Sequence, residues 1–276
     1  MGEKCILVVQ REPALWVDRC FPRYSALSLP LAGKPIVEHQ LDRCARVGAT
    51  RVLALDVSFD RRICEELGDG SRWGLKFDYR PCPPGATVEE LVERSRDFFG
   101  GERPVVVEGP EFYHYEEPVR ITSLREYFDA NLKVLADPGE CVLPGYASDR
   151  GVVLGMNVQI RMGCVVTSPV LLDDNVLIDY ECRLNGHVVV GEGCIIDRRA
   201  TLHRAIVFPR TYVARGVELE DKIVVGARVI DPITGACVNL ADDVLSSDLS
   251  GKRRWVPFRL MRLARFFRRA FSRDAG

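Results

Sequence analysis

Two histidines, His187 and His203, lie in the most regular part of this 276-residue chain. A histidine can take a proton near neutral pH, so either could deprotonate the acceptor in an acyl transfer. The two are 16 residues apart, and each falls near a corner of the repeat described below, so we expect that they do not stack in one column. We treat both as weak candidates, because a histidine at a corner is more often merely exposed to solvent.

An acidic cluster surrounds His114. Its other members are Glu111, Glu116 and Glu117. Carboxylate and imidazole groups bind metal ions, but a loop with this composition is more commonly solvated. We therefore predict no metal site.

The ten cysteines contain no C-x-x-C pair. Cys164, Cys182 and Cys194 occupy small-residue positions of the repeat, where their side chains should face inward. We expect the thiols to be reduced and unable to act as nucleophiles.

The elements that must position these side chains follow a period of six residues. One set of small or apolar positions consists of Val152, Val158, Cys164, Val170, Val176, Cys182, Val188, Cys194, Ala200, Ile206 and Tyr212. A second set, two places later, consists of Leu154, Ile160, Val166, Leu172, Ile178, Leu184, Val190, Ile196, Leu202, Phe208 and Ala214. The pattern predicts a β-solenoid over residues 151–245, including a terminal cap, and resembles the left-handed parallel β-helix of hexapeptide-repeat proteins.

The first 120 residues predict an α/β domain. The expected strands are residues 5–9, 51–55, 75–79 and 105–107, and the expected helices are residues 35–47 and 88–98. Alternation of strands and helices is typical of a Rossmann-like half domain with a parallel sheet. We expect a linker helix and loop over residues 121–150 and a basic amphipathic tail over residues 246–276.

Four segments resemble the sugar-1-phosphate nucleotidyltransferase family, in particular the mannose-1-phosphate guanylyltransferase type with its C-terminal β-helix. They are Pro30–His39, Arg46–Leu53, Gly68–Tyr79 and Leu124–Leu135. The resemblance implies transfer of a nucleotide to a sugar 1-phosphate with Mg²⁺. It also leads us to expect a truncated domain, because few residues separate the end of this sheet from the linker helix.

The chain departs from the family where the phosphates are bound. The family's G-x-G-T-R loop falls, without gaps, on Glu12, Pro13, Ala14, Leu15 and Trp16. Glycines let backbone N–H groups approach phosphate, whereas a glutamate repels it.

Two further motif positions are also replaced. The lysine of the family's P-K falls on Ala26, and the metal-binding aspartate of its G-D falls on Pro110. Lys34 is the one nucleotide-binding remnant that we identify.

These departures predict no catalytic residue and no cofactor. We expect a degenerate, non-catalytic scaffold or regulatory protein in bacterial exopolysaccharide or other surface-glycan synthesis, with a nucleotide sugar as a candidate ligand. One alternative is an active sugar-1-phosphate nucleotidyltransferase, an NDP-sugar pyrophosphorylase that would use Mg²⁺. The second alternative is a hexapeptide-repeat acyltransferase.

The tail carries a charge of +8 from Lys252 onward, although the whole chain has a net charge of −1. The residues that we expect at a membrane or partner surface are Arg259, Arg262, Arg265, Phe267, Arg269, Phe271 and Arg273. Such a helix can lie in an anionic membrane surface, or it can dock on acidic protein. Without a folded basic patch, we expect no nucleic-acid partner.

The sequence shows neither a long apolar stretch nor a secretory leader. We therefore expect a cytoplasmic protein, peripheral at the inner face of the cytoplasmic membrane near a membrane glycosyltransferase. We also expect a homo-oligomer, a dimer or a trimer.

Overall fold

The computed structural model describes residues 3–10, 15–46, 48–56, 67–81, 83, 85–99, 105–108, 111–114, 117–139, 141–147, 150–239 and 246–248. The chain divides into two compact units, residues Met1–Ser123 with Gly139–Val142, and residues Leu124–Pro138 with Leu143–Gly276. The tail surface of residues 259–273 lies outside the described residues. Within the described part of the chain, no helix has the length and apolarity needed to cross a membrane.

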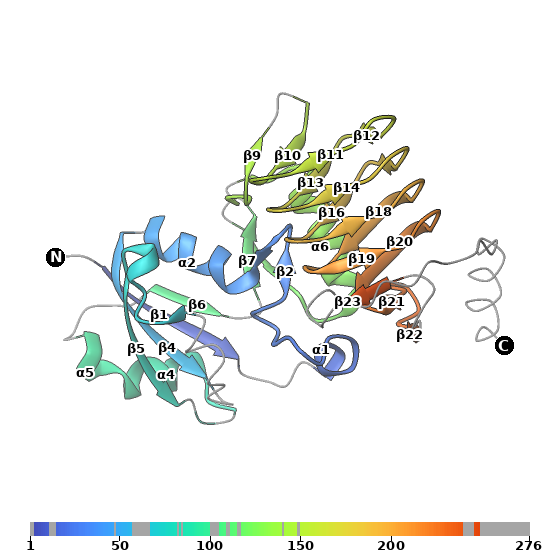
Figure 1. Ribbon diagram of the computed structural model, residues 1–276. Coiled ribbons are helices and arrows are strands. Elements are labelled where there is room, and N and C mark those ends of the chain that lie inside the picture. The colour runs from blue at the N-terminus through green and yellow to red at the C-terminus, as the bar shows by residue number, and fades with distance from the viewer. Residues whose placement is uncertain are drawn as a thin grey trace. The chain divides into compact units, whose positions relative to one another are not determined.

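A four-stranded parallel sheet forms the centre of the first unit (Figure 1). Its strands are β1 (Glu3–Gln10), β4 (Ala49–Asp56), β5 (Lys76–Pro81) and β6 (Val105–Glu108). They lie in the order β5-β4-β1-β6. Apolar runs such as Val52–Leu55 suit a sheet that is covered on both faces. The α/β half domain expected from the sequence is confirmed.

Helices and short strands complete this unit. They are α1 (Leu15–Cys20), β2 (Pro30–Leu31), β3 (Lys34–Pro35), α2 (Ile36–Arg46), η1 (Ser71–Trp73), α4 (Val88–Arg94), α5 (Arg96–Phe99), β7 (Glu111–His114) and β8 (Glu117–Arg120). Helix α2 buries Ile36, Val37, Leu41 and Cys44, as the sequence pattern predicts. Strands β2 and β3 form a hairpin whose turn residues, Ala32 and Gly33, both have positive φ.

The single helix predicted over residues 88–98 is wrong. The structure contains two helices, because Ser95 ends α4 with φ −106° and ψ 11°. A capping box between Thr87 and Glu90 fixes the start of α4. The break allows both Phe98 and Phe99 to pack in one core cluster with residues of β4 and α4.

The second unit is a parallel β-solenoid with three faces (Figure 1). The first face contains β10 (Val152–Leu154), β13 (Val170–Leu172), β16 (Val188–Val190), β18 (Thr201–Val207) and β20 (Glu218–Val225). The second contains β11 (Gln159–Ile160), β14 (Leu177–Ile178), β17 (Ile195–Ile196) and β19 (Thr211–Val213). The third contains β12 (Val165–Thr167) and β15 (Arg183–Asn185), and continues into β18 and β20.

The predicted repeat positions up to Leu202 form the solenoid core. Leu172, Leu184, Val190 and Leu202 are fully buried in one cluster. Successive coils place identical repeat positions in register, for example Val152 on Val170 and Val170 on Val188. The sequence therefore predicted both the solenoid and most of its core.

The predicted register is wrong beyond Leu202, because one coil is a residue shorter. The coil spacing is 18 residues from Val170 to Val188 and 17 residues from Val188 to Ala205. The corner between Leu202 and Ala205 has two residues, whereas the same corner of the preceding coil, between Leu184 and Val188, has three. The core positions are therefore Ala205, Val207 and Val213. The sequence pattern predicts Ile206, Phe208 and Ala214 instead, and of these Ala214 still packs, partly buried, against the core cluster.

Two of the displaced aromatic residues make other contacts. The predicted core residue Tyr212 instead donates its hydroxyl to Asp197. Phe208 lies 6.4 Å from the ring of Tyr127 on α6 (Leu124–Ala136). The helix that we expected as a linker thus packs within the second unit, where it also contacts β18.

The two ends of the solenoid differ. At the C-terminal end, β21 (Arg228–Ile230) and β22 (Cys237–Asn239) extend the first face in antiparallel fashion, and β23 (Ser246–Asp248) pairs with β19. At the N-terminal end, β9 (Tyr146–Ala147) is the one strand that adds to the solenoid among the described residues, and it lies beside β10. The N-terminal coil is therefore less covered than the C-terminal one.

Leu172 and Leu154 hold the same repeat position in adjacent coils but differ in burial. Leu172 is fully buried, whereas Leu154 is half-buried. We expect Leu172→Ala to lower the free energy of unfolding by about 2–5 kcal/mol and Leu154→Ala to lower it by less than half of that. Urea unfolding followed by circular dichroism measures both. Equal losses would contradict the burial gradient between the coils.

Asp173 predicts a pH dependence of stability. Its side chain lies at a corner and is 9% exposed. Burial raises the pKa of Asp173 from 3.8 to about 6, and the carboxylates of Asp174 and Glu192 act in the same direction. A raised pKa means that the folded protein binds the proton more tightly. The resulting stabilisation is complete below pH 3.8 and is lost as the pH rises through 6.

We therefore expect Asp173→Asn to raise the free energy of unfolding by about 2–3 kcal/mol at pH 7.5 and to have little effect at pH 4. The difference between the wild-type and variant pH profiles isolates this group from the other carboxylates. A flat difference profile for Asp173→Asn would refute the assignment.

Candidate functional site

The topology of the first unit places a switch point between β1 and β6. From β1 the sheet continues through β4 to β5 on one side, and β6 then adds to the other side of β1. In open α/β sheets, ligands bind outside the carboxyl ends of the strands at such a point. Val8 pairs with Glu108 here, so both strands end at the same edge.

The predicted motif positions come shortly after these two strand ends in the chain. Glu12 and Ala14 come after β1, which ends at Gln10, and Pro110 comes after β6, which ends at Glu108. All three residues lie outside the described residues. The structure thus brings the two strand ends together.

The described part of the expected phosphate loop belongs to α1. Leu15 is 74% exposed at the start of this helix. The ring of Trp16 meets that of Phe21 edge-on, with the centroids 6.2 Å apart. Neither side chain can supply a positive charge to a phosphate.

Ala26, where we expected the lysine of the family's P-K motif to fall, is buried. It is 3% exposed, and the next residue, Leu27, is 1% exposed. This position is therefore part of the hydrophobic core of the first unit. A lysine here would bury a charge, which is unfavourable without a partner.

Lys34, the nucleotide-binding remnant, is held by a carboxylate. Its ammonium group forms an ion pair with Asp42 of α2. Next to this pair, the Nε2 atom of His39 lies 2.9 Å from the carbonyl oxygen of Leu31. Burial lowers the pKa of His39 to about 4, so this imidazole is neutral at pH 7. The described contacts give Lys34 a structural role.

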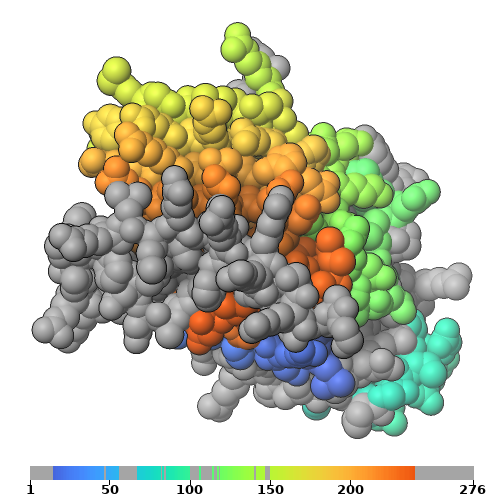
Figure 2. Space-filling model, turned by 90° about the vertical axis from the view of Figure 1, so that its right-hand side faces the viewer, coloured from blue at the N-terminus to red at the C-terminus, as the bar shows by residue number. Residues whose placement is uncertain are grey.

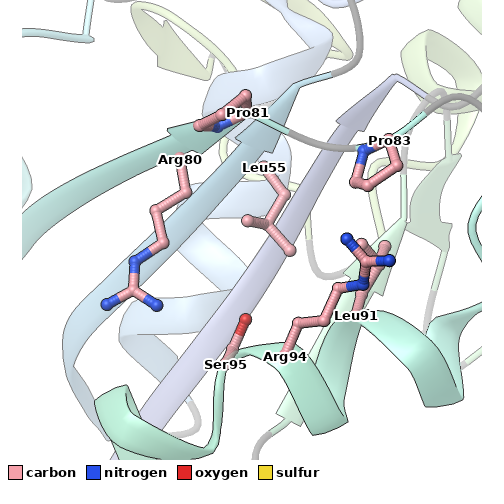
Figure 3. A pocket seen from close by; sticks show the side chains of 7 residues that line it. All are labelled: Leu55, Arg80, Pro81, Pro83, Leu91, Arg94 and Ser95. Carbon is pink, nitrogen blue, oxygen red and sulfur yellow. The ribbon is translucent and has the colours of Figure 1, made fainter.

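A cavity of about 480 Å³ opens near the carboxyl ends of β4 and β5, one strand away from the switch point (Figure 3). Its lining residues are Leu55, Arg80, Pro81, Pro83, Leu91, Arg94 and Ser95. Leucine and proline side chains make most of the wall apolar. Two guanidinium groups provide its positive charge.

The two arginines are in different electrostatic states. Arg80 donates two hydrogen bonds to Asp97, at 2.8 and 2.6 Å, and these bonds lower the pKa of that carboxyl. Among the described residues, no carboxylate forms an ion pair with Arg94. In Figure 3 the guanidinium of Arg94 points toward Pro83. The cavity can therefore bind a ligand that combines an anionic group with an apolar or ring portion.

Sequence reasoning missed this cavity. A signal was present, because Arg80 and Pro81 end a buried parallel strand and ligands gather at the carboxyl ends of such strands. The contribution of α4 could not be anticipated, since the predicted helix did not stop at Ser95.

The two histidines of the solenoid lie at the same corner of adjacent coils, but they do not stack in one column, because Val188 pairs with Ala205 and Arg204 is therefore the residue opposite His187. The shorter coil places His203 one layer below the corner that contains His187, so that His203 Nδ1 lies 2.6 Å from the carbonyl oxygen of Asn185. Burial lowers the pKa of His187, and the charges of Arg204 and His203 add to this effect. Arg204 in turn pairs with Asp221 at 2.6 Å. In the described part of the solenoid, no loop protrudes at this corner to cover the acyl-CoA that an acyltransferase would bind.

Two of the three thiols at repeat positions, Cys182 and Cys194, are buried. Burial raises the pKa of Cys182 to about 11 and that of Cys194 to about 12. Both are therefore thiols at neutral pH, and each S–H donates to a backbone carbonyl, that of Asp197 or Phe208. Neither thiol is available as a nucleophile.

The acidic cluster contributes one buried side chain to the described residues. His114 of β7 is 7% exposed and pairs across the hairpin with Glu117 of β8. In the described part of the chain, no three His, Cys, Asp or Glu side chains converge where they could hold a metal ion. We assign no step to Mg²⁺.

No protein-family model matches the chain. Among curated proteins, it is 29% identical over 89 residues to a glucose-1-phosphate thymidylyltransferase of Xanthomonas campestris pv. campestris, covering 31% of this chain and 30% of the relative. It is 27% identical over 154 residues to an N-acetylmuramate alpha-1-phosphate uridylyltransferase of Neisseria meningitidis serogroup B, covering 52% of this chain and 67% of the relative. The chain thus spans less than a third of the first relative's length.

A solved structure of a protein described as a glucose-1-phosphate thymidylyltransferase from Bacillus anthracis, in complex with sucrose, matches with a TM-score of 0.34 and 20% identity. The match covers 40% of this chain and 44% of that one. The resemblance drawn from the sequence is confirmed by the curated relatives: they are sugar-phosphate nucleotidyltransferases, related to this chain at modest identity.

Proposed function

We propose that this chain is a non-catalytic, sugar-nucleotidyltransferase-like scaffold or regulatory protein that binds a nucleotide sugar. Its context would be bacterial exopolysaccharide or other surface-glycan synthesis, and this context rests on the family resemblance. The relatives are named for transfer to glucose 1-phosphate and N-acetylmuramate 1-phosphate.

The burial of Ala26 is the observation that carries the proposal. Nucleotidyl transfer develops negative charge on phosphorus, and this charge must be met by cations or backbone donors. The position aligned with the family's lysine is a 3%-exposed methyl group in the core, and the loop positions at Leu15 and Trp16 belong to a helix. Lys34, meanwhile, is paired with Asp42.

The cavity beside β4 and β5 supports binding without catalysis. Arg94 can pair with a diphosphate, while Leu55, Leu91 and the prolines can contact a base or sugar ring. Ligand binding in the absence of turnover is what a sensor of activated sugars requires.

We predict that the purified chain releases no pyrophosphate from nucleoside triphosphates mixed with glucose 1-phosphate or mannose 1-phosphate and Mg²⁺. An active thymidylyltransferase serves as the positive control. Release that scales with the concentration of this chain would overturn the proposal in favour of the pyrophosphorylase alternative.

Calorimetric titration with UDP-glucose and dTDP-glucose tests the binding part. We expect Arg94→Gln to weaken the affinity about tenfold, because a hydrogen bond between charged groups is worth about 1.5–3 kcal/mol. Arg96→Gln is a matched control, since Arg96 is 76% exposed and pairs with Glu93 outside the cavity. Equal losses in both variants, or no binding by the wild type, would argue against a nucleotide-sugar sensor.

The tail makes a separate prediction about location. Full-length protein should float with vesicles that contain anionic phosphatidylglycerol, and it should not float with neutral vesicles, because each arginine near anionic headgroups contributes about 1 kcal/mol. Replacing the five tail arginines 259, 262, 265, 269 and 273 with glutamine should abolish flotation. Flotation that survives these substitutions would contradict a peripheral membrane role of the tail.

A further inference from the structure

The first coil of the solenoid, residues 152–167, exposes several large apolar side chains. Ile160 is 42% exposed, whereas Ile178, its counterpart one coil later, is fully buried. Met156, Met162 and Val165 are 64%, 82% and 48% exposed. We call these four residues, Met156, Ile160, Met162 and Val165, the end patch.

The backbone of this coil is also incompletely paired. Strand β11 pairs with β14, and β12 pairs with β15. Among the described residues, no strand pairs with the outer edge of either one. Figure 2 shows the first coil, coloured yellow-green, at one end of the stack of coils. Exposed apolar side chains beside open strand edges favour association with another chain.

The charge of this segment bears on its partner. Between residues 150 and 172 there are two arginines, Arg150 and Arg161, and no acidic residue. An apolar surface with so little charge fits another apolar surface rather than a strongly charged ligand. The first coil of a second copy presents the same apolar columns and the same open edges.

The opposite end of the solenoid limits how copies can associate. There the first face is extended by the antiparallel strands β21 and β22, and β19 is covered by β23. A head-to-tail stack would need this end to be open, so a chain of solenoids is blocked. Contact between two end patches uses the same surface twice and closes at two copies.

We propose that the end patch is the interface of an isologous dimer, in which the first coils of two copies of this chain meet. The proposal does not depend on the proposed function. One coil end is smaller than a standard protein interface, so we expect dissociation in the micromolar range, on the order of 1–100 μM.

Sedimentation velocity of the full-length protein over this concentration range tests the dimer. The wild type should shift from the 31.0 kDa monomer to twice that mass. Met162→Lys and Ile160→Lys should each raise the dissociation constant at least about tenfold. Met162 is 82% exposed, so its substitution leaves the core intact even where Ile160→Lys disturbs folding.

Ile233→Lys is the matched control, because Ile233 is a 63%-exposed apolar residue after β21, near the capped end. This variant should dimerise like the wild type. A monomeric wild type at the highest concentration, a dimer unaffected by either end-patch variant, or assemblies larger than two would each overturn the proposal.

Discussion

The stacking of one coil on the next is the constraint on which the second unit depends. Each coil must present its three faces in register with those of its neighbour, because the backbone hydrogen bonds and the inward side chains come from the same residues. The shorter coil shows how strict this constraint is. The missing residue is absorbed at the corner of His203 and Arg204, and Ala205 takes the core position that pairs with Val188.

The first unit retains the parallel sheet of a nucleotide-binding fold, but we propose a different function for the carboxyl edge of that sheet. The parallel sheet brings β1 and β6 together as nucleotide-binding folds do, yet the nearby positions hold the buried Ala26 and the paired Lys34. Arg94, which forms no ion pair among the described residues, lines the mainly apolar cavity near the ends of β4 and β5. We therefore propose that a ligand binds beside β5, where Arg94 can offer its positive charge.

The six-residue period of apolar side chains made the solenoid predictable, because residues six apart pack into the same core. It could not reveal the coil of 17 residues, since Ile206 and Phe208 are as apolar as the true core residues Ala205 and Val207. The parallel sheet followed from its apolar runs. The cavity was not foreseen, because it depends on the break at Ser95 and on which arginine Asp97 neutralises, and both are set by tertiary packing.

Hydrogen–deuterium exchange of the full chain with UDP-glucose, with and without Mg²⁺, tests most directly where a nucleotide sugar binds. The account predicts protection of residues 76–81 and 88–99, which form β5, α4 and α5, to the same extent whether or not Mg²⁺ is present. Protection that requires Mg²⁺ and falls on the segments following Gln10 and Glu108 would contradict it, because it would show a working transferase site at the switch point.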